Sequence, residues 1–125
     1  MKHIQIPHYH GKQDEIILEN ISQIKDFQII ADIFKLLSDS TRIKIFWILC
    51  HSEKCVLDIS SLMNMTSAAI SHHLKQLKNS HLVISERIGK EVYYKAADTN
   101  EAKFLHKSIE ELLNIACPKK ESEIL

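Results

Sequence analysis

Apolar residues recur at helical spacing through the first half of the chain. Between residues 14 and 37 they fall every three or four positions, which predicts one broken helix or two short helices. Ser38-Asp39-Ser40 then provides a helix start signal, and residues 41–50 predict a strongly apolar helix. We expect its large apolar side chains to belong to the core, namely Ile45, Phe46, Ile48 and Leu49.

The second half of the chain alternates between short helical and extended patterns. Residues 58–63, opened or capped by Asp58, predict a short helix, and the turn Asn64-Met65 joins it to a second one within residues 65–77. In that second helix, capped by a Thr or Ser, Ile70, Leu74 and Leu77 fall on one face. Residues 82–95 predict a β-hairpin that turns at Gly89-Lys90, and residues 98–116 predict the last helix.

Helix, turn, helix and hairpin in this order are typical of a winged helix-turn-helix domain. The predicted fold is mainly α with a small β-hairpin, over residues 14–117, with a flexible arm at 1–13 and a tail at 118–125. The N-terminal and C-terminal helices each carry an apolar stripe that a chain of 125 residues cannot cover internally. We therefore expect a homodimer that pairs through these helices.

Composition narrows the setting of the protein. A chain of 125 residues with 45% hydrophobic residues suits one ordinary globular domain. No apolar stretch approaches the roughly 18–20 residues that span a bilayer, and no apolar segment at the start resembles a signal peptide. Three cysteines without disulfide-framework spacing favour a reducing compartment. We expect a cytoplasmic protein without a membrane partner.

Charge is unevenly distributed although the formal net charge is zero. Residues 66–95 contain five Lys or Arg and two Glu, so the region of the second short helix and the hairpin carries about +3. The flanking regions carry the compensating acidic residues. A basic centre in a neutral protein permits contact with phosphates without attracting every polyanion.

The face of helix 65–77 that lies opposite its apolar stripe carries small and hydrogen-bonding side chains, suited to the DNA major groove. Ser71, His72 and Gln76 can bond base edges or phosphates, and Lys75 can neutralise a phosphate. Hydroxyls beside free backbone amides at the helix start also suit phosphate, and the hairpin would lay its cations along the neighbouring backbone or minor groove. The predicted contacts to double-stranded DNA are Thr66, Ser67, Ser71, His72, Lys75, Gln76, Arg87 and Lys90.

Four segments closely resemble signature segments of the ArsR/SmtB family of metal-responsive winged-helix repressors. They are residues 36–43 (LLSDSTRI), 53–59 (EKCVLDI), 71–74 (SHHL) and 92–94 (VYY). The resemblance covers roughly residues 27–117 and implies a homodimer that binds operator DNA and leaves it when an inducer binds. Two positions depart from the family pattern, Ala68 where a hydroxyl is frequent and His73 where Gln is frequent. They leave the target sequence open.

The resemblance implies an inducer site between the N-terminal arm and the helix that precedes helix 65–77. Where relatives often have Cys-Val-Cys-Asp, this chain has Cys55-Val56-Leu57-Asp58, and the arm supplies His8 and His10. Two His, one Cys and one Asp form a tetrahedral set suited to Zn²⁺, or to Co²⁺ or Cd²⁺. The alternative is that both histidines are solvated and that Cys55 is simply buried.

Two other inducer sites follow from the resemblance. Zinc sensors of the family bind metal on the last helix, but the matching positions after Asp98 are Asn100, Glu111 and Asn114, and amides are poor ligands for transition metals. Other relatives sense persulfide, oxidants or arsenite through cysteines. Cys50, Cys55 and Cys117 are therefore a candidate redox set, with Cys55 to Cys117 or Cys50 to Cys55 as the pair.

Other classes of function have less support in the sequence. A Gly-rich loop, a Ser-x-x-Lys motif and a zinc-protease motif are all absent, so we do not expect an enzyme. A winged helix used only for protein binding is the second alternative to a DNA-binding repressor. A metal-released repressor, with Zn²⁺ as the expected inducer and a thiol-sensing repressor as the first alternative, is the function that the sequence favours.

Overall fold

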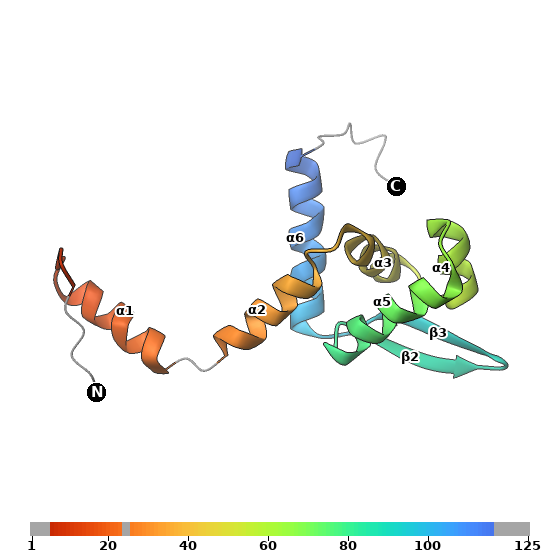
Figure 1. The fold of residues 1–125 in the computed structure, drawn as a ribbon, viewed down its shortest axis with the longest axis horizontal. Coiled ribbons are helices and arrows are strands. Elements are labelled where there is room, and N and C mark those ends of the chain that lie inside the picture. Colours follow the sequence, from red (N-terminus) through yellow and green to blue (C-terminus); the bar gives the residue numbers. More distant parts are fainter. Residues whose placement is uncertain (1–5, 24–25, 117–125) are drawn as a thin grey trace. The chain divides into compact units, whose positions relative to one another are not determined.

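The computed structural model describes residues 6–23 and 26–116. The elements follow the order α1 (Lys12–Gln23), α2 (Phe27–Leu36), α3 (Ser40–His51), β1 (Lys54–Cys55), α4 (Val56–Met63), α5 (Ser67–Asn79), β2 (Val83–Ile88), β3 (Glu91–Ala96) and α6 (Asn100–Ala116) (Figure 1). The chain divides into two compact units, Met1–Ile33 and Phe34–Leu125, with the boundary inside α2. Within the described residues, no helix is long and apolar enough to cross a membrane.

The first unit contains α1 and the beginning of α2, so the option of two short helices is confirmed. α1 begins at Lys12, where the backbone N–H of His10 donates to Asp14 Oδ2 at 2.8 Å. Residues 6–11 form no helix or strand, and the predicted tail at 118–125 lies outside the described residues. Large apolar side chains of this unit are exposed, namely Ile16, Ile17, Ile21, Phe27, Ile29 and Ile30.

Helix α3 begins where the polar start signal predicts. Asp39 is its N-cap, and the Asp39 carboxylate accepts hydrogen bonds from the backbone N–H of Thr41 at 2.8 Å and of Arg42 at 3.2 Å. Both hydrogen bonds lower the pKa of Asp39, and the bond from Arg42 has the larger effect. Desolvation acts in the opposite direction but does not cancel them. Of the predicted core residues of α3, Ile45, Phe46 and Leu49 are buried, and Ile48 is half-buried.

The predicted hairpin is confirmed and gains a third strand. The antiparallel sheet has the order β1-β3-β2, with Cys55 opposite Tyr93. Ile88 pairs with Glu91, so Gly89-Lys90 forms a two-residue turn, and Gly89 has a φ of +64°, which glycine adopts without strain. β1 was not predicted, because two residues carry no alternating pattern.

β1 also changes where the helix-turn-helix pair begins. The chain passes from β1 directly into α4 at Val56, so Asp58 lies in the first turn and does not cap the helix. Asn64 ends α4 in the left-handed conformation with φ 51°, which Asn tolerates better than most residues. Thr66 caps α5 by accepting a hydrogen bond from the Ala69 N–H at 3.2 Å, so the second helix begins at Ser67.

The core of the second unit lies between α3, α4, α5, the sheet and the first turns of α6. Its fully or nearly buried side chains come from every one of these elements and include Phe46, Ile59, Ile70, Leu74, Leu77, Leu82, Val83 and Ala102. Because α5 contacts α3, α4 and β2, its orientation is fixed from three sides. The core therefore holds α5 as a rigid element with one face left open.

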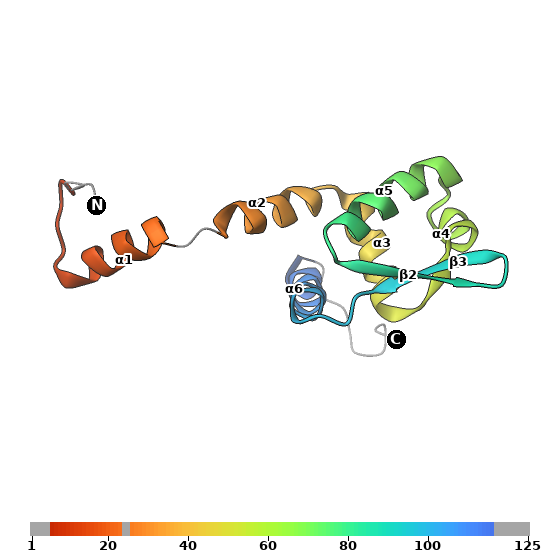
Figure 2. The same ribbon diagram turned by 90° about the horizontal axis from the view of Figure 1, so that it is seen from below.

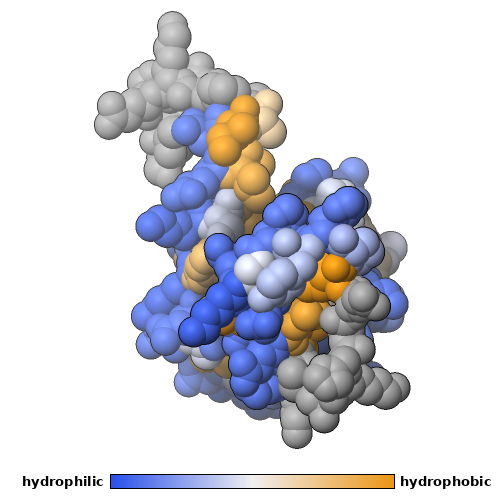
Figure 3. All heavy atoms as spheres, turned by 90° about the vertical axis from the view of Figure 1, so that its left-hand side faces the viewer, coloured by the Kyte–Doolittle hydropathy of each residue, from blue (hydrophilic) through white to orange (hydrophobic). Residues whose placement is uncertain are grey.

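The apolar stripe of α6 is only partly covered. Ala102 and Leu105 are buried, whereas four large side chains of this helix are exposed, namely Phe104, Leu112, Leu113 and Ile115. Figure 3 shows apolar side chains exposed along the helix that rises to the top of the view, which is α6 in Figure 1. These side chains together expose a larger apolar surface than scattered single residues would.

Candidate nucleic-acid interface

The open face of α5 carries the side chains that the helical period predicts. Ile70, Leu74 and Leu77 are completely buried, which turns Ser71, His72 and Lys75 to the solvent. Of the eight predicted DNA contacts, Thr66, Ser67, Ser71, His72, Lys75, Arg87 and Lys90 are exposed and Gln76 is half-buried. The set lies on two neighbouring elements, α5 and the β2-β3 hairpin (Figures 1 and 2).

A hydrogen bond fixes the hairpin to α5. Lys78 Nζ donates to Ser85 Oγ at 2.7 Å, so the end of α5 is bound to β2 and Lys78 already has a partner. Alternate residues of a strand share a face, which places Arg87 on the same side of β2 as Ser85 and hence on the side facing α5. The alternation therefore places Arg87, an exposed cation, on the side of the hairpin that faces α5.

On the open face itself, two predicted contacts are hydrogen-bonded to each other. The Nε2 atoms of His72 and Gln76 lie 3.2 Å apart, one turn apart on α5. This contact pre-orders two side chains that can each offer a donor or an acceptor. Less rotamer entropy then has to be lost when they meet a base edge.

His73, one of the two departures from the family pattern, faces inward and connects α5 to the start of α3. Arg42 Nε donates to His73 Nδ1 at 3.1 Å, and a terminal nitrogen of the same guanidinium donates to the Leu36 carbonyl oxygen at 3.1 Å. Nδ1 must be unprotonated to accept this bond. Burial lowers the pKa of His73, the positive charge of Arg42 acts in the same direction, and the charge of Asp39 only partly opposes them. The neutral imidazole is thus part of the packing that holds α5.

Acid should therefore weaken the fold through His73. The pKa of His73 is lower in the folded chain than in the unfolded chain, where it is 6.5. The contribution of neutral His73 to the free energy of unfolding is therefore complete above pH 6.5. It is lost as the pH falls from 6.5 toward the lower pKa of the folded chain. For His73→Gln, whose amide does not titrate, we expect a shallower fall of the free energy of unfolding between pH 7 and 5. The difference in slope is at most about 1.4 kcal/mol per pH unit, because one proton is involved. Urea unfolding at several pH values measures it, and Lys75→Gln, an exposed position on the same helix, is the control that should keep the wild-type slope.

The predicted metal ligands lie in both units. His8 and His10 are exposed in the first unit, whereas Cys55 is buried at the N-cap of α4 and Asp58 is exposed in its first turn, both in the second unit. Cys55 and Asp58 share the first turn of one helix directly before α5. The four-ligand site stays a prediction.

The cysteines offer little support for thiol chemistry. Cys50 and Cys55 are both free thiols, and Cys117 lies outside the described residues. Burial, with a smaller contribution from the charge of Glu110, raises the pKa of Cys50 to about 11. The thiolate is the reactive form, so Cys50 is a poor nucleophile at neutral pH.

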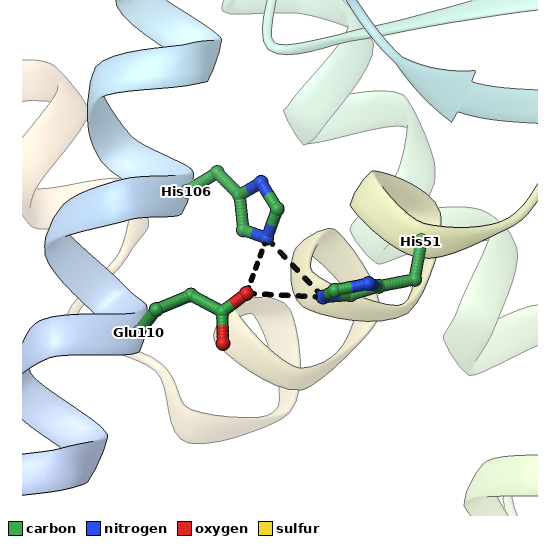
Figure 4. Close-up of polar contacts among 3 residues, drawn as sticks. All are labelled: His51, His106 and Glu110. Atoms are coloured by element: carbon green, nitrogen blue, oxygen red, sulfur yellow. Dashed lines mark hydrogen bonds and ion pairs between the residues drawn. The ribbon is translucent and has the colours of Figure 1, made fainter. Parts of the chain in front are cut away.

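His51, His106 and Glu110 form a further cluster of polar side chains, which the sequence did not predict (Figure 4). His51 is the last residue of α3, while His106 and Glu110 are one turn apart on α6. The spacing of His106 and Glu110 was visible in the sequence, but the pairing with His51, 55 residues away, depends on the packing of α3 against α6.

Comparison with known proteins matches the part of the chain that contains the α4-α5 pair. Residues 39–85, from the cap of α3 to β2, match the family described as bacterial regulatory protein, arsR family. The chain is 31% identical over 94 residues to a transcriptional repressor SmtB homolog from Synechocystis, covering 75% of this chain and 71% of that protein. It is 40% identical over 83 residues to a CadC homolog, a cadmium resistance transcriptional regulatory protein from Staphylococcus aureus, covering 62% of this chain and 69% of that protein.

The fold agrees with these matches. The homodimeric winged helix-turn-helix DNA-binding domain of Mb0332 from Mycobacterium bovis superimposes with a TM-score of 0.64 at 20% identity, covering 90% of this chain and 94% of that chain. This likeness establishes the winged helix-turn-helix fold. The family match begins at Asp39, the N-cap residue of α3, and includes the whole α4-α5 pair. Both the resemblance and the expectation of a DNA-binding regulator rather than an enzyme are confirmed, and the chain belongs to the arsR family of bacterial transcriptional regulators.

Proposed function

We propose that this protein is a homodimeric repressor that holds operator DNA through α5 and the β2-β3 hairpin and releases it when a divalent metal ion binds. The observation that carries the proposal is the open polar face of α5 beside a hairpin with two exposed cations, in a chain whose family is one of bacterial regulatory proteins and whose relatives include a transcriptional repressor. Because the apolar side of α5 is buried in the core, the helix keeps its polar face turned to the solvent.

In the proposed complex, α5 lies in the major groove. Its N-terminal end carries Ser67 and Ala68, small residues that let the helix backbone approach the bases closely. Ser71, His72 and Gln76 contact base edges or phosphates, and Lys75 contacts a phosphate. Arg87 and Lys90 follow the adjacent backbone or minor groove from the hairpin. The free N–H groups of the first turn of α5 add a further phosphate contact.

The proposed dimer covers the apolar faces that the single chain leaves open. Phe27, Ile29 and Ile30 on α2 are exposed, as are Leu112 and Leu113 on α6. A two-fold axis through such faces buries them against their own copies. A dimer of this kind carries two copies of α5, one for each of two half-sites in successive major grooves. The homodimeric state of the Mycobacterium bovis domain supports this arrangement.

For the inducer, the names of the relatives favour a divalent metal ion, since one of them is a cadmium resistance regulator. We propose Zn²⁺ bound by His8, His10, Cys55 and Asp58. Cys55 is the N-cap residue of α4 and pairs with Tyr93 of β3, and α4 packs directly against α5, so a metal held there acts on a helix that positions α5. A coupling free energy of about 1–3 kcal/mol between metal and DNA is typical of such regulators.

The DNA-binding proposal is tested with the purified full chain and labelled DNA from upstream of its own gene. We expect Lys75→Gln and Arg87→Gln each to weaken binding and to lower the slope of log affinity against log salt by about two, because each removes one phosphate contact from each chain of the dimer. Fluorescence anisotropy between 50 and 300 mM salt measures both quantities.

Lys107→Gln, which removes one exposed positive charge from α6, is the matched control and should leave the salt slope unchanged. Equal slopes for the wild type and all three variants would contradict the proposal. In that case the winged helix would serve as a protein-binding module.

A further inference from the structure

We infer that His51, His106 and Glu110 form a binding site for a borderline divalent metal ion such as Zn²⁺, separate from the site at Cys55. Three potential ligand atoms converge there from two helices. His106 Nε2 lies 3.2 Å from His51 Nε2 and 2.8 Å from Glu110 Oε1, and His51 Nε2 lies 3.3 Å from the same oxygen (Figure 4). The three atoms form a nearly equilateral triangle.

The size of this triangle suits a tetrahedral metal ion. Zn–N and Zn–O distances of about 2.0–2.1 Å place neighbouring ligand atoms of a tetrahedron about 3.3 Å apart. The observed sides of 2.8 to 3.3 Å match that spacing without any change of helix position. Two imidazoles and one carboxylate are also the donor types that borderline metals such as Zn²⁺, Co²⁺ and Ni²⁺ accept, and three protein ligands leave a fourth position for water.

The surroundings hold the ligands in place and leave them accessible. The Trp47 ring packs on the His51 ring with centroids 4.4 Å apart, and the His51 and His106 rings meet edge to face with centroids 4.8 Å apart. Such outer contacts commonly orient metal ligands. The side chains of His51, His106 and Glu110 are 40%, 29% and 41% exposed, so an ion can enter from solvent without opening the core.

Hydrogen bonding alone satisfies this group poorly. Each Nε2 carries at most one proton, yet the two Nε2 atoms face each other and both face the same carboxylate oxygen. When both imidazoles are neutral, each Nε2 atom either carries a proton or presents a lone pair. Every combination of the two leaves a repulsive contact within the triangle or a lone pair that no donor reaches. A cation at the centre would satisfy all three atoms together.

The position of the site suggests its effect. A metal there would clamp the C-terminal end of α3 to α6, and the other end of α3 carries Arg42, which bonds His73 on α5. α6 also carries the exposed apolar side chains of the proposed dimer surface. Through α3 and α6 the metal therefore acts on both the reading helix and the dimer. This regulatory part rests on the proposed function, whereas metal binding itself does not.

Co²⁺ titration of the full chain tests the site, because tetrahedral Co²⁺ absorbs visible light and thiolate ligation adds a near-ultraviolet band. In a Cys55→Ser background, which disables the sequence-predicted site, we expect the visible bands to remain without a strong near-ultraviolet band. Glu110→Gln and His106→Gln should each weaken Co²⁺ binding at least about tenfold. Glu101→Gln, another exposed carboxylate on α6, is the matched control and should bind like its parent.

The outcomes separate this inference from the proposed function. Co²⁺ affinity that is equal in the Glu110→Gln and Glu101→Gln variants, with circular dichroism showing both folded, would overturn the site. Weaker binding in Glu110→Gln alone supports it. Zn²⁺ is then added to the DNA complexes of the same proteins. If the cluster binds metal but Zn²⁺ releases DNA from neither the Cys55→Ser parent nor the wild type, the site stands and the metal-inducer proposal fails. If the Cys55→Ser parent still releases DNA and Glu110→Gln loses release, the cluster is the inducer site, the metal-released repressor stands, and the proposed site at Cys55 is overturned.

Discussion

Replacing Leu112 and Leu113 together by Glu is expected to turn the dimer into a monomer and to weaken operator binding about 10³-fold or more. The two side chains are 63% and 51% exposed on α6 in the single chain, and two-fold symmetry would place four of them in the interface. Full burial of an exposed Leu side chain contributes roughly 1.5–3 kcal/mol, so these four side chains, already partly buried in the single chain, contribute about 3–7 kcal/mol to association. A monomer contacts one half-site and keeps little of the difference between specific and non-specific binding.

Sedimentation equilibrium and fluorescence anisotropy measure the two parts of this prediction. Lys107→Glu is the matched control, because it also lowers the charge of each chain by two on an exposed position of α6. It should leave the protein dimeric. A double variant that remains a dimer with wild-type affinity for DNA would show that α6 lies outside the interface.

The second large effect is expected in the core. Phe46 on α3 is completely buried among the elements that hold α5, and Phe46→Ala leaves a cavity there. Such substitutions cost about 3–5 kcal/mol, a large part of the 5–15 kcal/mol by which a domain is usually stable. We expect the urea midpoint to fall steeply and DNA binding to be lost with the fold.

The unfolding measurement has to be made at one chain concentration, because the stability of a dimer depends on it. Lys44→Ala, two residues away on the exposed side of α3, should change the free energy of unfolding by less than about 0.5 kcal/mol. A loss below about 1 kcal/mol for Phe46→Ala would mean that α3 is not central to the core.

Local chemistry explains why several elements could be predicted to within a residue or two. Asp39 accepts from the first amides of α3, Thr66 does the same for α5, and Gly89 supplies the positive φ of the hairpin turn. Each signal acts on neighbours in the chain, so it can be recognised without the fold. The start of α4 was misplaced for the converse reason. β1 exists only through its pairing with β3, and that pairing brings the helix start forward to Val56.

The sequence by itself determined the reading surface of this protein. One helical period on α5 assigns Ile70, Leu74 and Leu77 to the core and thereby assigns the opposite side chains to DNA, and the matched segments assign the family. Only the tertiary structure decided which histidines act together. It joined His73 to Arg42 across 31 residues and His51 to His106 across 55, because the packing of α3 against α5 and α6 sets those distances. Helical periodicity acts over a few residues, whereas contacts between helices arise only when the core closes around them.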